Sequence, residues 1–251
     1  MELLPNSITL FDLFLLILFC FIGAAISTSI GTGGGLVVIG AMSLVIPVTA
    51  LLSIHAIIQA GSGILRAIIF RNSFYKKFFF LFMFGTLFGY FFATQFLIVL
   101  PEYFLKLFLG LGIIILTLIP NFKIDNISNT KIIIFGAITG FLTMFVGVMG
   151  PLLGIFLSSF LTNRHIIVGT LAWCISFQNL GKAIIFGGLG FDYTPWINLI
   201  LILIVFSYFG TLFGKKLLDK SNDELFKKII KIVIIFLGGK LVIESILLML
   251  K

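Results

Sequence analysis

Long apolar runs, broken at glycine, proline and short charged clusters, divide the chain into segments of helical length. Between Asp12 and Arg66 there is no Asp, Glu, Lys or Arg, which leaves room for about two membrane spans of ~20 residues each. The pattern predicts five segments on each side of a polar stretch at 121–130. They are 10–30, 33–47, 49–70, 76–99 and 102–120, then 131–147, 150–162, 166–187, 194–214 and 226–249.

Two of these segments, 33–47 and 150–162, are short for a hydrocarbon core of ~30 Å. Each could cross the membrane or form a re-entrant hairpin with the segment before it. The sequence therefore predicts an all-α, polytopic membrane protein with 8 to 10 spans.

The second half of the chain repeats features of the first at a fixed spacing. The run from Arg66 to Phe70 returns 116 positions later as Lys182 to Phe186, with only its first residue changed. The same spacing places Gly31, Gly34 and Gly35 on Gly147, Gly150 and Pro151. We predict a single transmembrane domain, 1–251, built from repeat 1 at 8–120 and repeat 2 at 131–251. An internal repeat is typical of membrane carriers, in which the substrate lies between the halves.

An odd number of segments in each half means that the second half enters the membrane in the opposite sense. The loop charges agree with this topology. We take the loop that holds Arg71, Lys76 and Lys77 as cytoplasmic and count the membrane crossings from there. This count places 11 of the 17 basic residues in cytoplasmic loops. This predicts inverted repeats in the plasma membrane, a cytoplasmic linker at 121–130, and both termini outside.

Composition excludes a water-soluble domain, because 60% of the residues are hydrophobic and only 10% are charged. The net charge of +8 lies mostly in short loops, so we interpret it as a topology signal and expect no nucleic-acid partner. The two cysteines, Cys20 and Cys174, lie in apolar segments and are expected to pack there, so no metal site is predicted. The partners expected are the lipid bilayer and a small solute.

Two packing features are also predicted. The sequence Gly-Thr-Leu-Phe-Gly occurs at 85–89 and again at 210–214, and glycines four residues apart permit close helix approach. The phenylalanine-rich stretch 78–92 is expected to face lipid.

Two glycine turns interrupt the apolar runs at matching places in the two halves. The first is Gly31, Thr32, Gly33, Gly34 and Gly35, and the second runs from Gly147 through Gly150 to Pro151. A helix begins after each, and the free N–H groups of a helix N-terminus can cradle an anion. Close helix packing is the alternative explanation. Their occurrence at matching places in inverted halves favours a substrate site.

The order and spacing of several motifs resemble the sulfite exporter TauE/SafE family, also called the TSUP permeases. They are Gly31 to Gly35 at the start of the second segment, Ser62-Gly63 through Arg66 to Arg71-Asn72, and Gly210 to Leu241. The last includes Gly214-Lys215-Lys216, Asp223 to Phe226 and Gly239-Lys240-Leu241. Gly40, where family members often have proline, and Met149 depart from the pattern. The resemblance implies a permease for small sulfur-containing anions such as sulfite, thiosulfate or sulfonates, often moved outward.

Charged and polar residues inside the third and eighth segments are candidates for an anion pathway. A cation inside a membrane helix costs ~2.5–3.5 kcal/mol on insertion scales, so Arg66 and Lys182 either face the pathway or extend to the interface. Amide and hydroxyl groups could replace the hydration shell of an anion or bond between helices: Gln59, Ser62, Gln178 and Asn179. His55 could carry a coupled proton or simply pack between helices.

The leading hypothesis is an alternating-access permease that exports a small anion, with both glycine turns lining its site. No cofactor and no catalytic group is expected, since no clustered His, Asp or Glu suggests one. A non-transporting assembly or scaffold protein, and a membrane-embedded enzyme, are the alternatives. The oligomeric state is left open.

Overall fold

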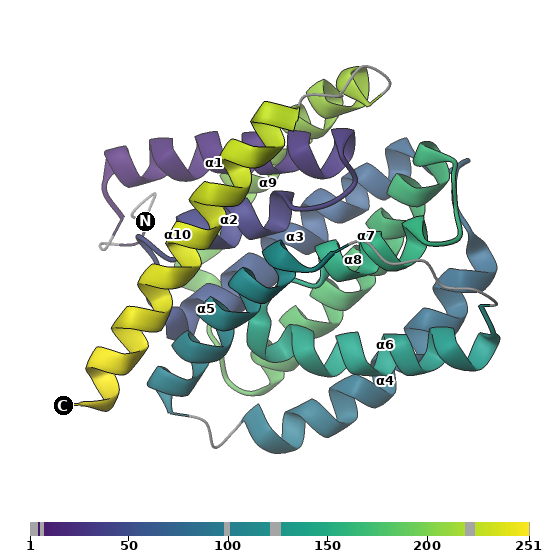
Figure 1. The fold of residues 1–251 in the computed structure, drawn as a ribbon. Helices are drawn as coiled ribbons and strands as arrows, with labels where there is room; N and C mark the ends of the chain where they lie inside the picture. Colours follow the sequence, from purple (N-terminus) through teal and green to yellow (C-terminus); the bar gives the residue numbers. More distant parts are fainter. Residues whose placement is uncertain (1–4, 6–7, 98–100, 121–126, 219–223, 251) are drawn as a thin grey trace.

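The computed structural model describes residue 5 and residues 8–97, 101–120, 127–218 and 224–250, and this part of the chain is helical without a strand. Ten α-helices and one short 3-10 turn follow each other (Figure 1). The first half has α1 (Leu10–Ser29), α2 (Gly34–Met42), α3 (Val48–Ile69), α4 (Lys76–Leu97) and α5 (Glu102–Leu118). The second has α6 (Asn129–Val146), α7 (Gly150–Ser158), α8 (Arg164–Gly188), η1 (Thr194–Trp196), α9 (Ile197–Leu217) and α10 (Glu224–Met249).

Helices of the first half pack against helices of the second half. The first helix of each half packs along the fourth helix of the other, so that α1 lies with α9 and α6 with α4, as Figure 1 shows. The third helices, α3 and α8, pack against each other, and so do the fifth helices, α5 and α10. This pairing is what a pseudo-twofold axis between the halves produces.

The repeats are inverted, as predicted. The end of α3 lies near the start of α8, where the rings of Phe70 and His165 are 6.0 Å apart between centroids. Further back along α3, Gly63 packs against Ser176, further along α8. The two repeat-equivalent helices are therefore antiparallel, which requires that the two halves run in opposite senses. The boundaries 8–120 and 131–251 of the repeats within one domain, 1–251, stay predictions.

Both Gly-Thr-Leu-Phe-Gly motifs pack helix against helix, which confirms the prediction. A Cβ at Gly85 or Gly89 in α4 would collide with the backbone of α6. A Cβ at Gly210 or Gly214 in α9 would collide with the backbone of α1. The same motif thus holds each half to the first helix of the other, because only glycine allows backbones to approach so closely.

The short helices α2 and α7 end earlier than the apolar pattern predicted. Each has nine residues, and a rise of ~1.5 Å per residue makes each too short to cross a membrane alone. At the repeat-equivalent positions Ser43 and Ser159, the side-chain hydroxyl donates a hydrogen bond of 2.6 Å to the carbonyl three residues earlier. Each hydroxyl thereby satisfies a backbone carbonyl in the last turn of its helix, where no further turn supplies an N–H donor.

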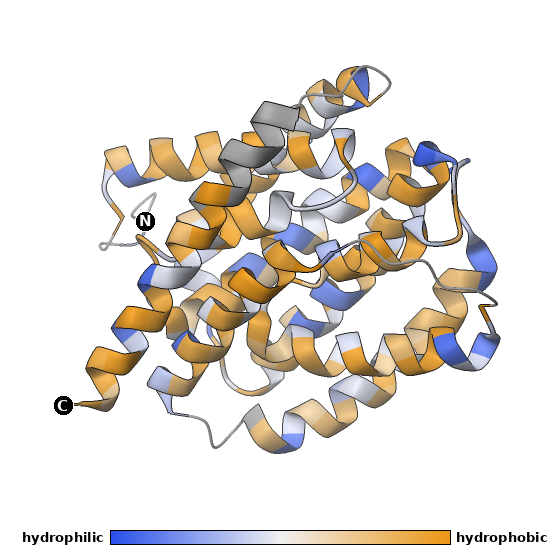
Figure 2. Cartoon of the chain, in the orientation of Figure 1, coloured by the Kyte–Doolittle hydropathy of each residue, from blue (hydrophilic) through white to orange (hydrophobic). Residues whose placement is uncertain are grey.

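The surface is that of a multi-pass membrane protein. Within the described residues, five helices are long and apolar enough to cross a membrane, and α5 contributes a shorter apolar helix. Figure 2 shows hydrophobic residues along most of the helices, with hydrophilic ones mainly near helix ends and at a few interior positions. The stretch 78–92 faces outward only in part: Phe80 and Phe84 are exposed, but Phe78 and Phe82 are buried. The prediction for the last two was wrong, because their rings pack against Phe156 of α7 and Phe135 of α6.

Basic loops meet at one end of the bundle, which we call the basic end. There Arg164 donates a hydrogen bond of 3.3 Å to the carbonyl of Leu218, and the ammonium of Lys215 lies 5.8 Å from the ring centroid of Phe70. Most of the predicted linker, 121–126, lies outside the described residues.

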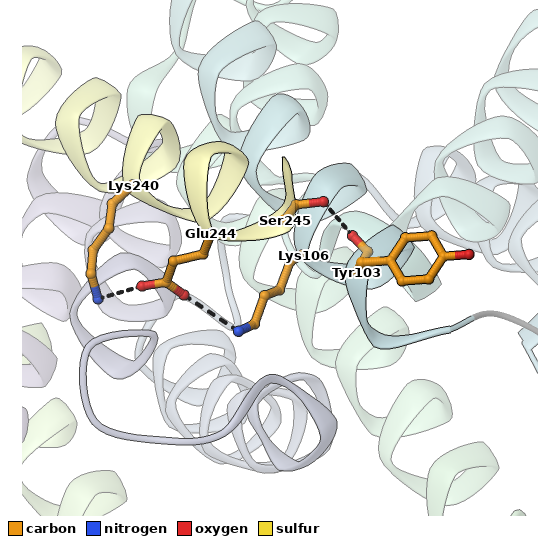
Figure 3. A network of polar contacts seen from close by, with 5 residues as sticks. All are labelled: Tyr103, Lys106, Lys240, Glu244 and Ser245. Atoms are coloured by element: carbon orange, nitrogen blue, oxygen red, sulfur yellow. Dashed lines mark hydrogen bonds and ion pairs between the residues drawn. The ribbon is translucent and has the colours of Figure 1, made fainter. Parts of the chain in front are cut away.

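The opposite end carries an ion-paired group that ties α5 to α10 (Figure 3). Glu244 pairs with Lys106 at 3.4 Å and with Lys240 at 3.0 Å. Beside it, the hydroxyl of Ser245 donates to the carbonyl of Tyr103 at 2.7 Å.

Candidate functional site

A small polar cavity lies where the two halves meet, between the glycine turns and helices α3 and α8. Its volume of ≈ 20 Å³ is about what one ordered water needs. The walls that the sequence predicted are Gly31, Thr32, Gly33, Gly35, His55, Gln59, Arg66, Gly147, Gly150, Pro151, Gln178 and Asn179.

The first turn is built by glycine backbone geometry. Gly31 and Gly33 have φ values of 90° and 91°, a region that only glycine enters without strain. Gly33 precedes the first residue of α2, so the N-terminus of that helix opens at the cavity. Gly34 instead faces α1, where a Cβ would collide with the carbonyl of Gly23 and the hydroxyl of Ser27. This contact fixes the direction in which α2 leaves the turn.

The second turn is similar but offers fewer donors. Gly147 has a φ of 81°, and α7 follows with Pro151 in its first turn. Proline has no N–H, whereas its repeat equivalent Gly35 has one, so the start of α2 has one more backbone donor than the start of α7. The two turns touch, since a Cβ on Gly35 would lie 3.2 Å from Val148. Both turns therefore form one wall of the cavity.

Arg66 supplies the positive charge of the cavity. Its side chain is 2% exposed and lines the cavity from α3. One terminal nitrogen donates a long hydrogen bond of 3.5 Å to the hydroxyl of Ser62, and Nε has no hydrogen-bond partner. No carboxylate lies among the cavity residues. The arginine therefore lacks a protein counter-ion in the cavity, and a bound anion would supply one.

Lys182, the repeat equivalent of Arg66, has a different environment. It is fully buried and does not belong to the cavity wall, and its ammonium donates a hydrogen bond of 2.7 Å to the carbonyl of Gly147. The lysine thus ties α8 to the second glycine turn. Its geometry is that of a support for the cavity wall.

The two amide side chains of α8 that line the cavity, Gln178 and Asn179, also bond to the surrounding protein. Gln178 donates from Nε2 to the hydroxyl of Thr139 at 3.1 Å, which orients its amide. Asn179 donates from Nδ2 to the carbonyl of Ile175 at 2.9 Å, while its Oδ1 is buried without a partner. Across the cavity, the ring of His55 is buried beside the backbone of Gly35 and makes no well-formed hydrogen bond. Unpaired buried polar groups are costly, so these atoms point to a polar occupant of the cavity.

The structure brings twelve of the fifteen predicted residues to the cavity wall and leaves three behind it: Gly34, Ser62 and Lys182. Sequence reasoning missed four wall residues: Ser27, Val148, Met149 and Ile175. A signal for Ile175 existed, since it is the repeat equivalent of Gln59 at the spacing of 116. Within the described residues, no group of three or more His, Cys, Asp or Glu side chains could hold a metal ion.

Inverted helical halves that enclose a polar cavity define a class of protein, the multi-pass membrane transporters. The family model described as Sulfite exporter TauE/SafE matches residues 15–241, and the chain belongs to this family. No curated protein and no solved structure matches the chain. Membership implies a membrane transporter of sulfite-type anions rather than an enzyme.

Proposed function

We propose that this protein exports small sulfur-containing anions, of the sulfite, thiosulfate and sulfonate class, through the cavity between its inverted halves. The observation that carries the proposal is Arg66, a buried cation in the cavity wall with no carboxylate beside it. An unpaired buried charge is costly, and an oxyanion on the guanidinium would remove that cost. The N-terminus of α2 would add backbone donors on the same side.

The remaining polar groups suit the same ligand. Gln59, Asn179 and His55 surround the space beside Arg66, so they could replace part of the hydration shell of an oxyanion. We keep His55 as a candidate for a coupled proton, because its buried ring makes no well-formed hydrogen bond within the protein.

Alternating access is the mechanism that the symmetry favours. Two inverted halves can exchange conformations, which would open the same site first to one side and then to the other. The basic end, with Arg164 and Lys215, would face the cytoplasm of a plasma membrane, with both chain termini outside.

Export by this route is expected to follow the membrane potential. Moving one negative charge outward gains ~2.3 kcal/mol per 100 mV, which corresponds to about a 50-fold concentration ratio for a monoanion. Purified protein in proteoliposomes, loaded in turn with labelled sulfite, thiosulfate and an alkyl sulfonate, tests this under potassium diffusion potentials of both signs. Efflux that rises when the inside is negative supports the proposal. Absence of flux for all three anions would contradict it.

Lys182 and Arg66 are expected to differ in kinetics. Lys182→Met removes the bond to the carbonyl of Gly147 and leaves the cavity charge in place. We expect the maximal rate to fall about tenfold, the effect of ~1.4 kcal/mol, with the half-saturating anion concentration within about twofold of the wild-type value. The measurement is initial flux against anion concentration. If the half-saturating concentration rises while the maximal rate is kept, Lys182 binds the anion directly.

A further inference from the structure

Two larger cavities open at opposite ends of the bundle. The first, at the basic end, has a volume of ≈ 400 Å³ and includes Ser29, Arg164 and Val168 in its wall. The second, at the opposite end, has a volume of ≈ 350 Å³ and includes Pro47 and Leu51 beside the ion-paired Lys106–Glu244–Lys240 group. We call them the basic vestibule and the opposite vestibule. Each is many times larger than the central cavity.

The vestibules are related by the repeat. The basic vestibule is lined by the turn before α8, and the opposite vestibule is lined by the turn before α3. The N-cap residues of these two helices, Asn163 and Pro47, are 116 positions apart, which is the spacing of the repeat. Four pairs of wall residues share this spacing: Leu161 and Val45, Thr162 and Ile46, Arg164 and Val48, Ile167 and Leu51. Since α3 and α8 are antiparallel, the pseudo-twofold axis carries one vestibule onto the other.

Apolar side chains lie between each vestibule and the glycine turn of the central cavity nearest to it. At the basic end, Val168 lines the vestibule and also packs behind the first glycine turn. A Cβ placed on Gly31 would lie 3.7 Å from the side chain of Val168 and 3.7 Å from that of Leu171. At the opposite end, a Cβ on Gly147 would lie 2.9 Å from Leu52, the neighbour of the vestibule residue Leu51. Val168 and Leu52 are both buried and occupy equivalent repeat positions.

From this geometry we propose that Val168 and Leu52 are the two gates of the anion pathway, one for each vestibule. An apolar constriction excludes a hydrated anion, because water leaves it. Moving Val168 away from the first glycine turn would join the central cavity to the basic vestibule. Moving Leu52, together with Ile39 packed beside it, away from the second turn would open the cavity toward the opposite vestibule. This inference rests on the proposed transport function and adds to it the two routes by which the anion would enter and leave.

The two barriers differ in depth. Gly147 is backed by three side chains, Ile39, Leu52 and Leu109, and its carbonyl is bonded to Lys182. Gly31 is backed by Val168 and Leu171 at longer distances. Fewer side chains therefore pack behind Gly31 than behind Gly147, and we expect the basic gate to open first.

Side-specific cysteine labelling tests the gates without measuring transport. Val168→Cys and Leu52→Cys are placed separately in full-length protein that carries Cys20→Ala and Cys174→Ala, since both natural cysteines would compete. A membrane-impermeant thiol reagent is added from each side of oriented vesicles. We expect Val168→Cys to react only from the basic end and Leu52→Cys only from the opposite end. Ile184→Cys, on the exposed face of α8, is the matched control and should stay unlabelled.

Flux measurements provide the second test. The double variant Val168→Ala/Leu52→Ala widens both barriers, and we expect anion flux to rise about tenfold because several methyl groups leave the constrictions. The double variant Ile184→Ala/Ile68→Ala changes exposed positions of the same two helices and should keep the wild-type rate.

The outcomes separate the gates from the proposed function. If wild-type protein transports but both cysteines react from the same side, or from neither, the gate assignment is wrong. If labelling is side-specific as expected and wild-type protein carries none of the three anions, the access routes stand and the proposed substrate class fails.

Discussion

Arg66→Gln is expected to lower the flux of a sulfur oxyanion by about 100-fold in folded protein, since hydrogen bonds to charged groups are worth about 1.5–3 kcal/mol. Glutamine keeps much of the length and polarity of the side chain but removes the only charge in the cavity wall that is always present. The half-saturating anion concentration should rise, because the lost interaction is with the anion itself.

Two further variants make this result specific. Arg66→Lys keeps the charge but loses the planar fork of donors, so we expect it to recover only part of the flux. Arg71→Gln removes an exposed arginine of the α3–α4 loop and should change flux little, which controls for net charge. Each variant is checked for monodisperse behaviour before flux is measured. Wild-type kinetics for Arg66→Gln in folded protein would remove Arg66 from the binding site.

Gly34→Ala is expected to give the largest loss of stability. The new Cβ would overlap the carbonyl oxygen of Gly23 and the hydroxyl of Ser27, and backbone atoms of a packed helix cannot move aside cheaply. Overpacking of this kind typically costs about 1–3 kcal/mol. It would also push α2 away from α1 and displace the glycine turn that forms the cavity wall. We therefore expect a lower midpoint of thermal unfolding together with loss of anion flux.

Gly239→Ala is the matched control for this substitution. Gly239 lies inside α10, and nothing lies within 4 Å of a Cβ placed on it. Alanine in a helix interior is favoured over glycine by roughly 0.5–1 kcal/mol, so this variant should be as stable as the wild type or more stable. Equal unfolding midpoints for Gly34→Ala and Gly239→Ala would show that the α1–α2 contact does not hold the turn.

Much of the fold could be predicted because it depends on local pattern. Apolar runs bounded by glycine, proline and charge marked all ten helices, and the repeat of Arg66-Ala-Ile-Ile-Phe at Lys182 gave the symmetry. The ends of α2 and α7 were predicted too late. Hydropathy marks where an apolar run stops, and it carries no information about where the backbone hydrogen bonds of a helix stop within that run.

The candidate site was predictable as a set of residues but not as a set of roles. Equivalent positions suggested equivalent functions for Arg66 and Lys182. Arg66 lines the cavity, however, whereas Lys182 donates a hydrogen bond to the carbonyl of Gly147. The difference depends on which atoms lie within about 3 Å, a hydrogen-bonding distance that no spacing along the chain encodes. Phe78 and Phe82 show the same limit, since their burial depends on α6 and α7, far along the sequence.

The most direct measurement is the position of a bound anion. Selenite resembles sulfite in charge and shape, and selenium can be located by anomalous scattering in a crystal of the full-length protein. We expect a selenium peak between the two glycine turns, within contact of the Arg66 guanidinium, and no such peak in Arg66→Gln. A peak only at the Lys106–Glu244–Lys240 group, in protein that transports selenite, would contradict it.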